Sequence, residues 1–196
     1  MNPKINILIL NWNGKKVLKS CIDSLKNIKY SNFIITVIDN GSTDKSLDII
    51  KKDYKKVKIV ELGQNYGYSA GYNNFLKKIN KESSDYFMLL NNDTEVDPNI
   101  LNEFNKARLH FGDDNIYGAK IFYHSDPNKI WYAGGKVNLK YAHIYHVGIR
   151  KYDNKKFSIP TLTDYVTGCC IFAHSSLISK LNGFDVGQTS ISFPAS

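Results

Sequence analysis

Apolar runs alternate with amphipathic stretches through the first half of the chain. Four continuous runs, at 5–10, 33–38, 57–62 and 86–90, lack the alternation of a half-exposed strand and predict strands covered on both faces. Between them, apolar residues recur at helical spacing, in three groups: Val17, Leu18, Cys21, Ile22, Leu25 and Ile28; Leu47, Ile50 and Tyr54; Tyr72, Phe75, Leu76 and Ile79. This alternation predicts an α/β fold with a mainly parallel, doubly wound sheet and right-handed crossovers.

The second half of the chain has a different pattern. A helix is predicted over 98–111 and a strand over 116–123. From 129 to 157, aromatic and β-branched residues are mixed with Gly, His and Lys, which indicates antiparallel strands and loops. The length of 196 residues and the 42% apolar content suit one domain, 1–196, with a proper core, or a slightly incomplete larger domain.

A polar cluster follows each of the four predicted parallel strands. The clusters are Asn11–Gly14, Asp39–Asp44, Gly63–Gly71 and Asn91–Asp93. A turn needs only a glycine or an asparagine, so repeated Asp and Asn at one sheet edge favour a binding crevice over turn chemistry alone. The crevice is not an ordinary dinucleotide site, because neither Gly-x-Gly-x-x-Gly nor a Gly-Lys-Ser/Thr loop is present.

The cluster Asn91-Asn92-Asp93 can hold a hard cation against a diphosphate, because it offers compact oxygen-bearing side chains and one full anion, Asp93. The alternative interpretation is a polar turn at the end of a strand, before a helix that opens at Asp97-Pro98. His143 and His146 invite a second metal hypothesis, but no carboxylate is near them in the sequence, and surface or packing roles are favoured.

Composition narrows the class of partner and the compartment. The net charge of +8 rests on lysines spread along the chain, with two arginines only, which argues against a dedicated nucleic-acid binder. The three cysteines have neither disulfide nor metal-site spacing, so a reducing compartment is expected. No run approaches a membrane span or a secretory leader, so we expect a cytoplasmic protein and leave open peripheral attachment to the inner face of the membrane.

The ordered motifs resemble those of family 2 glycosyltransferases with the GT-A fold, of the rhamnosyltransferase-like branch. The resemblance covers roughly residues 4–185. Its segments are Asn11-Trp12-Asn13-Gly14, Ile38–Asp44, Asn65–Asn74 (similar to Asn-x-Gly-Phe-Ala-x-Gly-x-Asn), Leu90–Thr94 at the place of Asp-x-Asp, Trp131–Gly135 and Tyr165–Phe172. Each segment alone is weakly specific, whereas the ordered set is strongly so.

The resemblance implies a nucleotide-diphosphate-sugar donor, UDP- or dTDP-linked, and a glycan or lipid-linked acceptor. Asp39 would accept a hydrogen bond from the imide of the base, and Trp12 and Asn11 would form a wall beside it. The path of the sugar diphosphate would be lined by Asn65, Gly67, Asn74 and Asn92. Asp93, with Asn91 in place of the usual first aspartate, would bind Mg²⁺ or Mn²⁺. Residues 1–97 would then form the donor half and 98–185 the acceptor half.

The chain departs from the family at its C-terminal end. An inverting enzyme needs a carboxylate to take the acceptor's proton, and the family places it in a Glu-Asp segment after Gly-Phe-Asp. Here Gly183-Phe184-Asp185 is followed by a divergent tail, 186–196, without Asp or Glu, so no catalytic base is assigned. This loss of pattern indicates a chain cut short before that segment, a shifted reading frame or a degenerate relative of the family.

Three functions remain open from the sequence. The first is an inverting glycosyltransferase, or its donor-binding portion, acting in cell-surface polysaccharide synthesis. The second is an inactive remnant that binds nucleotide sugars without turnover. The third, less favoured, is a nucleotidyltransferase, which would need a glycine-rich basic phosphate loop after the first strand that this chain lacks.

Overall fold

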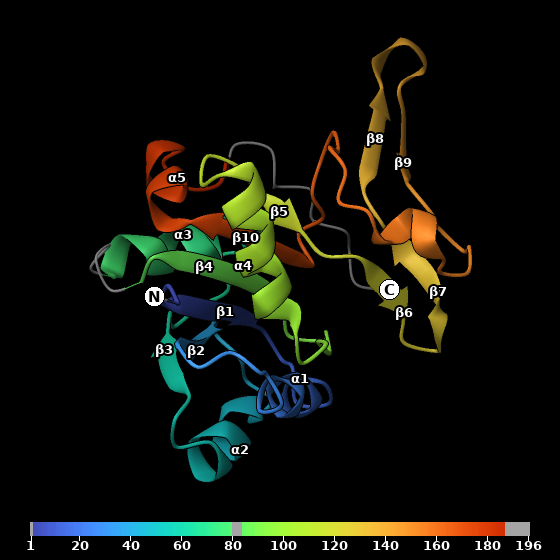
Figure 1. Cartoon of the computed structure of the whole chain (residues 1–196). Coiled ribbons are helices and arrows are strands. Elements are labelled where there is room, and N and C mark those ends of the chain that lie inside the picture. The colour runs from blue at the N-terminus through green and yellow to red at the C-terminus, as the bar shows by residue number, and fades with distance from the viewer. Residues whose placement is uncertain (1, 80–83, 187–196) are drawn as a thin grey trace.

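A six-stranded mixed sheet forms the centre of the molecule (Figure 1). The computed structural model describes residues 2–79 and 84–186. The strand order is β3-β2-β1-β4-β10-β5, in which the first four strands are parallel, β10 is antiparallel to β4, and β5 is antiparallel to β10. The strands are β1 Ile5–Asn11, β2 Phe33–Asp39, β3 Lys58–Glu61, β4 Tyr86–Asn91, β5 Tyr117–Gly118 and β10 Cys170–His174.

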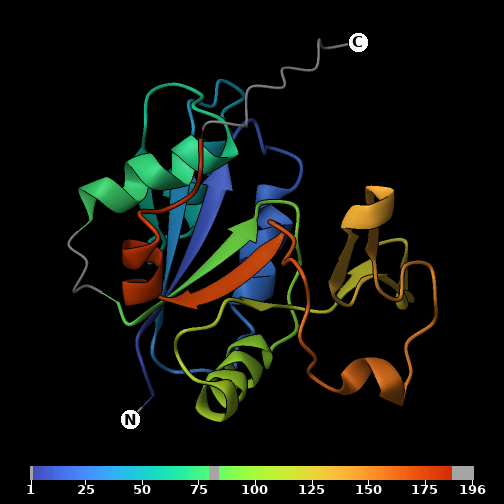
Figure 2. The ribbon, with the colours of Figure 1, turned by 90° about the horizontal axis from the view of Figure 1, so that it is seen from above.

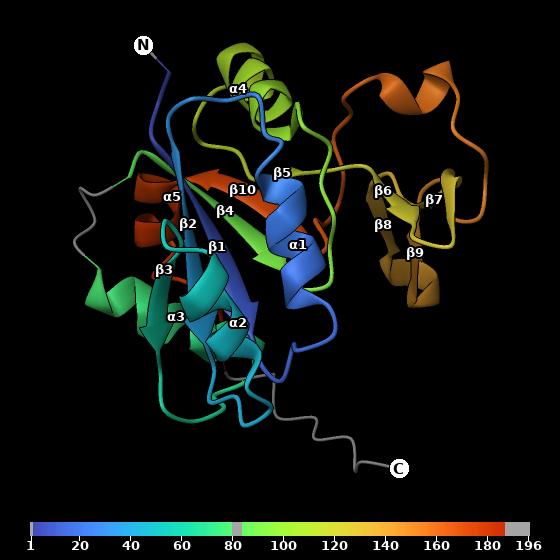
Figure 3. The same cartoon turned by 90° about the horizontal axis from the view of Figure 1, so that it is seen from below.

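Helices cover both faces of this sheet, which explains the continuous apolar runs. In β1, Ile5, Ile7 and Ile9 pack in one core with α1, α2 and α4, whereas Leu8 packs in a second core with α3 and α5. Figure 3 shows α1 and α2 in front of the strands. The helices are α1 Leu18–Leu25, α2 Ser46–Asp53, α3 Tyr68–Lys78, α4 Ile100–Phe111 and α5 Ser175–Lys180.

The predicted alternation of parallel strands and helices is confirmed through β4, and the mixed sheet is completed by a strand that the sequence did not predict. Cys170–His174 runs back against β4, and Figure 2 shows its arrowhead pointing opposite to those of β1 and β4. The sheet therefore draws strands from both proposed halves, and the division at residue 97 stays a prediction about function.

The prediction of one strand over 116–123 is wrong, because the structure has two short strands in this segment. Tyr117–Gly118 pairs with β10 in the main sheet, and β6, Ile121–Tyr123, leaves the sheet to pair with β7. The antiparallel extension predicted over 129–157 is present. It contains β7 Asp126–Tyr132, β8 Gly135–Asn138, the 3₁₀ turn Leu139–Tyr141, β9 His143–His146 and the 3₁₀ turn Lys155–Ser158.

None of the helices in residues 2–79 and 84–186 combines the length and the apolar character that crossing a bilayer requires. Of the predicted divergent tail, residues 187–196 lie outside the described residues.

Candidate functional site

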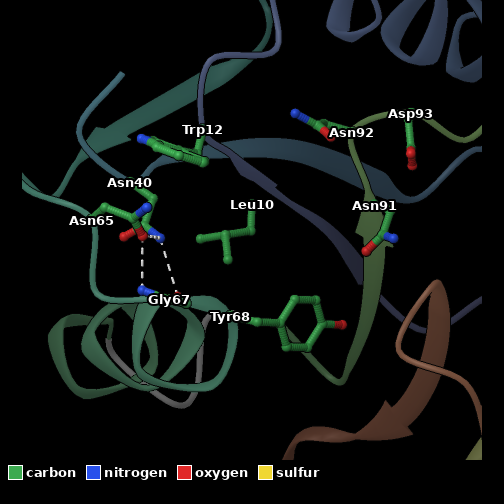
Figure 4. A pocket seen from close by; sticks show the side chains of 9 residues that line it. All are labelled: Leu10, Trp12, Asn40, Asn65, Gly67, Tyr68, Asn91, Asn92 and Asp93. Carbon is green, nitrogen blue, oxygen red and sulfur yellow. Dashed lines mark hydrogen bonds between the residues drawn. The ribbon is translucent and has the colours of Figure 1, made fainter. Parts of the chain in front are cut away.

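A hollow of about 270 Å³ lies at the carboxyl ends of the parallel strands (Figure 4). Strand register builds it: Asn11 at the end of β1 is the partner of Asp39 on β2, and Leu10 is the partner of Asn91 on β4. The polar clusters predicted to converge at this edge do so. The lining residues are Leu10, Trp12, Asn40, Asn65, Gly67, Tyr68, Asn91, Asn92 and Asp93.

Asn40 fixes the loop that forms one side of the hollow. Its amide Nδ2 donates to Asn65 Oδ1 at 2.9 Å and to the Gly67 carbonyl at 3.1 Å, while its Oδ1 accepts from the Tyr66 N–H at 3.0 Å. The side chain is 2% exposed. Sequence reasoning included Asn40 only within a polar cluster, and its position directly after a buried strand was the signal that could have identified it.

Asn11 is not among the residues that line the hollow, and its side chain is fully buried, so it does not supply the exposed surface expected of it beside Trp12. Its Nδ2 donates to Asp39 Oδ1 at 3.2 Å and to the hydroxyls of Ser42 and Ser46, each at 3.0 Å, and its Oδ1 accepts from Asn92 at 2.9 Å. Asn11 therefore joins the ends of β1, β2 and β4. Trp12, 55% exposed, provides the open aromatic surface.

Asp39 lies behind the lining residues and is 4% exposed. Its Oδ1 accepts from Asn11 and its Oδ2 accepts from the Ser42 N–H at 3.0 Å. A carboxylate oxygen can accept two hydrogen bonds, so each oxygen keeps capacity for one further donor. Its assignment to the base of a nucleotide stays a prediction.

Asn65 and Gly67 line the hollow, whereas Asn74 does not. Gly67 precedes α3 with φ +77, a conformation that favours glycine and brings the first turn of α3 toward the hollow. The neighbouring Asn73 has a contact that the sequence did not suggest. Its amide donates to the Phe184 carbonyl at 2.7 Å and accepts from the Phe184 N–H at 2.9 Å, which ties the Gly-Phe-Asp segment to α3.

Tyr68 is a second lining residue that sequence reasoning missed. Its hydroxyl donates to the Gly168 carbonyl at 2.5 Å, and burial raises the pKa of this phenol, so the hydroxyl keeps its proton. The bond joins the first turn of α3 to the loop that leads into β10. Segments predicted for the donor and acceptor sides thus meet at this residue.

The Asn91-Asn92-Asp93 cluster completes the opposite side of the hollow. Asn92 is held by its bond to Asn11, and Asn91 is fixed by backbone pairing with Leu10 and Cys169. Asp93 is exposed, and no hydrogen bond or salt bridge within the described part of the chain engages its carboxylate. It is the one carboxylate among the described lining residues.

The comparison with protein-family models decides the family. The model described as "Glycosyl transferase family 2" matches residues 6–181. The chain belongs to this family. The relationship expected from the ordered motifs is confirmed, while placement in the rhamnosyltransferase-like branch stays a prediction.

Relatives of this family 2 glycosyltransferase are distant and longer. A UDP-Glc:alpha-D-GlcNAc-diphosphoundecaprenol beta-1,3-glucosyltransferase of Escherichia coli is 30% identical over 71% of this chain and 57% of its own length. An uncharacterised glycosyltransferase of Rickettsia typhi is 27% identical over 94% of this chain and 54% of its own. A teichoic acid poly(glycerol phosphate) polymerase of Staphylococcus epidermidis is 29% identical over 47% of this chain and 13% of its own. The chain thus spans less than two thirds of each.

Two solved structures confirm the GT-A fold. A mannosyltransferase from Pyrobaculum calidifontis, in complex with GDP-Man and Mn²⁺, superimposes with a TM-score of 0.64 at 12% identity over 94% of this chain and 48% of its own. TarS residues 1–349 of S. aureus, in complex with UDP-GlcNAc, gives 0.60 at 18% identity over 91% and 47%. Because both structures are less than 20% identical to this chain, the similarity supports a shared fold and nothing further.

The side-chain oxygens that line the hollow are of the kind that bind a hard divalent cation. Asp93 offers a carboxylate and Asn91 an amide oxygen, and Mg²⁺ and Mn²⁺ prefer such ligands. Within residues 2–79 and 84–186, no group of three or more His, Cys, Asp or Glu is placed to hold an ion. A cation bound by Asp93 therefore needs further oxygens from its ligand or from water.

The two histidines of the extension cannot share an ion. His143 and His146 lie on β9 at positions that face opposite sides of a strand. His146 packs on Trp131 with ring centroids 4.6 Å apart, and His143 stacks on Tyr145 at 5.4 Å. Packing roles, favoured from the sequence, agree with these contacts.

Proposed function

We propose that the chain binds a nucleotide-diphosphate sugar, UDP- or dTDP-linked, in the hollow and forms the donor-binding portion of an inverting glycosyltransferase. The base would lie against Trp12, with its imide donating to Asp39. The sugar diphosphate would pass Asn65, Gly67 and Asn92. The acceptor is proposed to be a cell-surface glycan or a lipid-linked glycan, in keeping with the names of the relatives.

One observation carries this proposal. The same hollow is surrounded by the exposed aromatic face of Trp12, the loop fixed by Asn40 and the carboxylate of Asp93, which no residue of 2–79 or 84–186 engages. An aromatic surface at one end and an anionic, oxygen-rich end suit a nucleoside diphosphate accompanied by a cation. A binding surface for a neutral sugar alone would not need the isolated carboxylate.

Asp93 and Asn91 would hold Mg²⁺ or Mn²⁺ beside the diphosphate. When bound, the cation supplies Lewis-acid stabilisation to the leaving nucleoside diphosphate. The residues of the chain position the donor: Asn40 keeps the Asn65–Gly67 loop in place, and the bond from Tyr68 to Gly168 fixes the loop before β10. A base for the acceptor is not assigned to any residue.

Calorimetric titration with UDP and with dTDP tests the proposal, each in the presence of Mn²⁺ or Mg²⁺ and again with a chelator. We expect binding to depend on the metal and Asp93→Ala to weaken the metal-dependent part by at least about tenfold, which corresponds to about 1.4 kcal/mol. Glu95→Ala is the matched control, because Glu95 is an exposed carboxylate in the same loop that does not line the hollow.

Two results would contradict the proposal. One is the absence of nucleoside diphosphate binding with and without metal. The other is an equal loss of affinity in the Asp93 and Glu95 variants, which would assign the effect to the general charge of the loop.

A further inference from the structure

The hairpin formed by β8 and β9 projects away from the sheet (Figure 1) and carries apolar side chains in solvent. Every residue from 137 to 145 is exposed. The exposed fractions are large for apolar residues: 36% for Val137, 88% for Leu139, 70% for Tyr141 and 63% for Ile144. A cluster of this kind marks an interaction surface rather than a part of the core.

Strand pairing makes this hairpin amphipathic. Val137 is the cross-strand partner of Ile144, so these two side chains share one face. Lys136 pairs with Tyr145 and Asn138 with His143, which puts polar and cationic groups on the other face. At the tip, Leu139 and Tyr141 flank Lys140.

The segment that contains the hairpin is basic, although Asp164 contacts its base and forms a salt bridge with Lys136 at 3.1 Å. Residues 127–152 include five Lys or Arg and no Asp or Glu. Within the described residues Lys140 forms no salt bridge, and its ammonium lies 5.3 Å from the centre of the Tyr141 ring. A lysine between an exposed leucine and tyrosine can extend its charge to a phosphate while its neighbours enter the acyl boundary.

We propose that this hairpin docks the protein on an anionic lipid bilayer, with Leu139, Tyr141 and Ile144 entering the interface and Lys140 contacting lipid phosphates. Cationic charge next to exposed apolar and aromatic groups matches the negative surface of such a membrane. A second copy of the chain is a less suitable occupant, because a symmetric contact would bring the two Lys140 side chains together and the four-residue strands offer little area.

Co-sedimentation with vesicles tests the proposal without nucleotide, so its outcome is independent of the donor site. We expect the chain to bind vesicles of phosphatidylcholine mixed with phosphatidylglycerol, to bind phosphatidylcholine alone weakly, and to be released by salt. Leu139→Ser combined with Ile144→Ser should lower the partition coefficient at least about tenfold. Leu109→Ser is the control, because Leu109 is 68% exposed on α4, outside the hairpin.

Lys140→Gln should also weaken binding to the anionic vesicles, and Lys78→Gln, at an exposed lysine of α3, should weaken it less. Circular dichroism establishes that each variant is folded. The proposal is overturned if the double variant binds anionic vesicles as the parent does, or if the two lysine variants lose affinity equally. It is also overturned if the chain self-associates without lipid and the double variant becomes monomeric in sedimentation velocity.

Discussion

Asn40→Ala is the substitution that tests most directly how the donor side of the hollow is built. The change removes three hydrogen bonds, to Asn65, Tyr66 and Gly67, from a side chain that is 2% exposed. A hydrogen bond of this kind contributes about 1 kcal/mol net, which gives about 3 kcal/mol as the upper value. The three partners belong to exposed residues and regain water, so we expect a loss of about 2 kcal/mol in the free energy of unfolding.

The same substitution should lower both the stability of the chain and its affinity for nucleotide. A loss of about 2 kcal/mol lowers the melting temperature by roughly 4–8 °C for a chain of this size. The freed loop would then have to be ordered on binding, so the affinity for UDP with Mn²⁺ should fall as well.

Urea unfolding followed by circular dichroism measures the stability term, and calorimetry at a temperature where the variant is folded measures the binding term. Asn128→Ala is the control, since Asn128 is an exposed asparagine whose side chain makes no hydrogen bond with other described residues. An unfolding free energy for Asn40→Ala within about 0.5 kcal/mol of the control would refute the reasoning that this side chain fixes the loop.

Two further predictions concern titration and thiol reactivity. The ammonium of Lys19 donates a hydrogen bond to Asp23 and holds the pKa of this carboxyl well below its usual range. The ionised carboxylate of Asp23 therefore contributes stability above about pH 4, and this contribution is lost as pH falls through the lower pKa of the folded state. Asp23→Asn should flatten the acid side of the stability profile measured by urea unfolding. Ellman's reagent at pH 8 should modify the part-exposed Cys169 first, because burial raises the pKa of Cys21 to about 12 and raises that of Cys170 strongly as well. Equal reaction rates for all three thiols would contradict the burial that the structure gives them.

The strands and helices of the first half were predictable because their pattern is local. Ile5, Ile7, Leu8 and Ile9 are apolar on both faces of one strand, and only burial between two helix layers suits such a run. The meeting of the polar clusters at one edge was also predictable, because parallel strands place their carboxyl ends at the same edge of a sheet. The strand Cys170–His174 was not predicted, because it is short and its partner β4 is distant in sequence.

The sequence by itself determined the order of elements through β4, the sheet edge that holds the hollow, and the residue types available there, including Trp12 and Asp93. Tertiary structure alone decided which polar side chains face the hollow and which support it. Asn11 and Asn40 are the same residue type at the ends of neighbouring strands, yet one is buried without lining the hollow and the other lines it while holding a loop. That difference depends on hydrogen bonds to residues about 25 to 81 positions away, and such long-range contacts leave no periodic signal in the sequence.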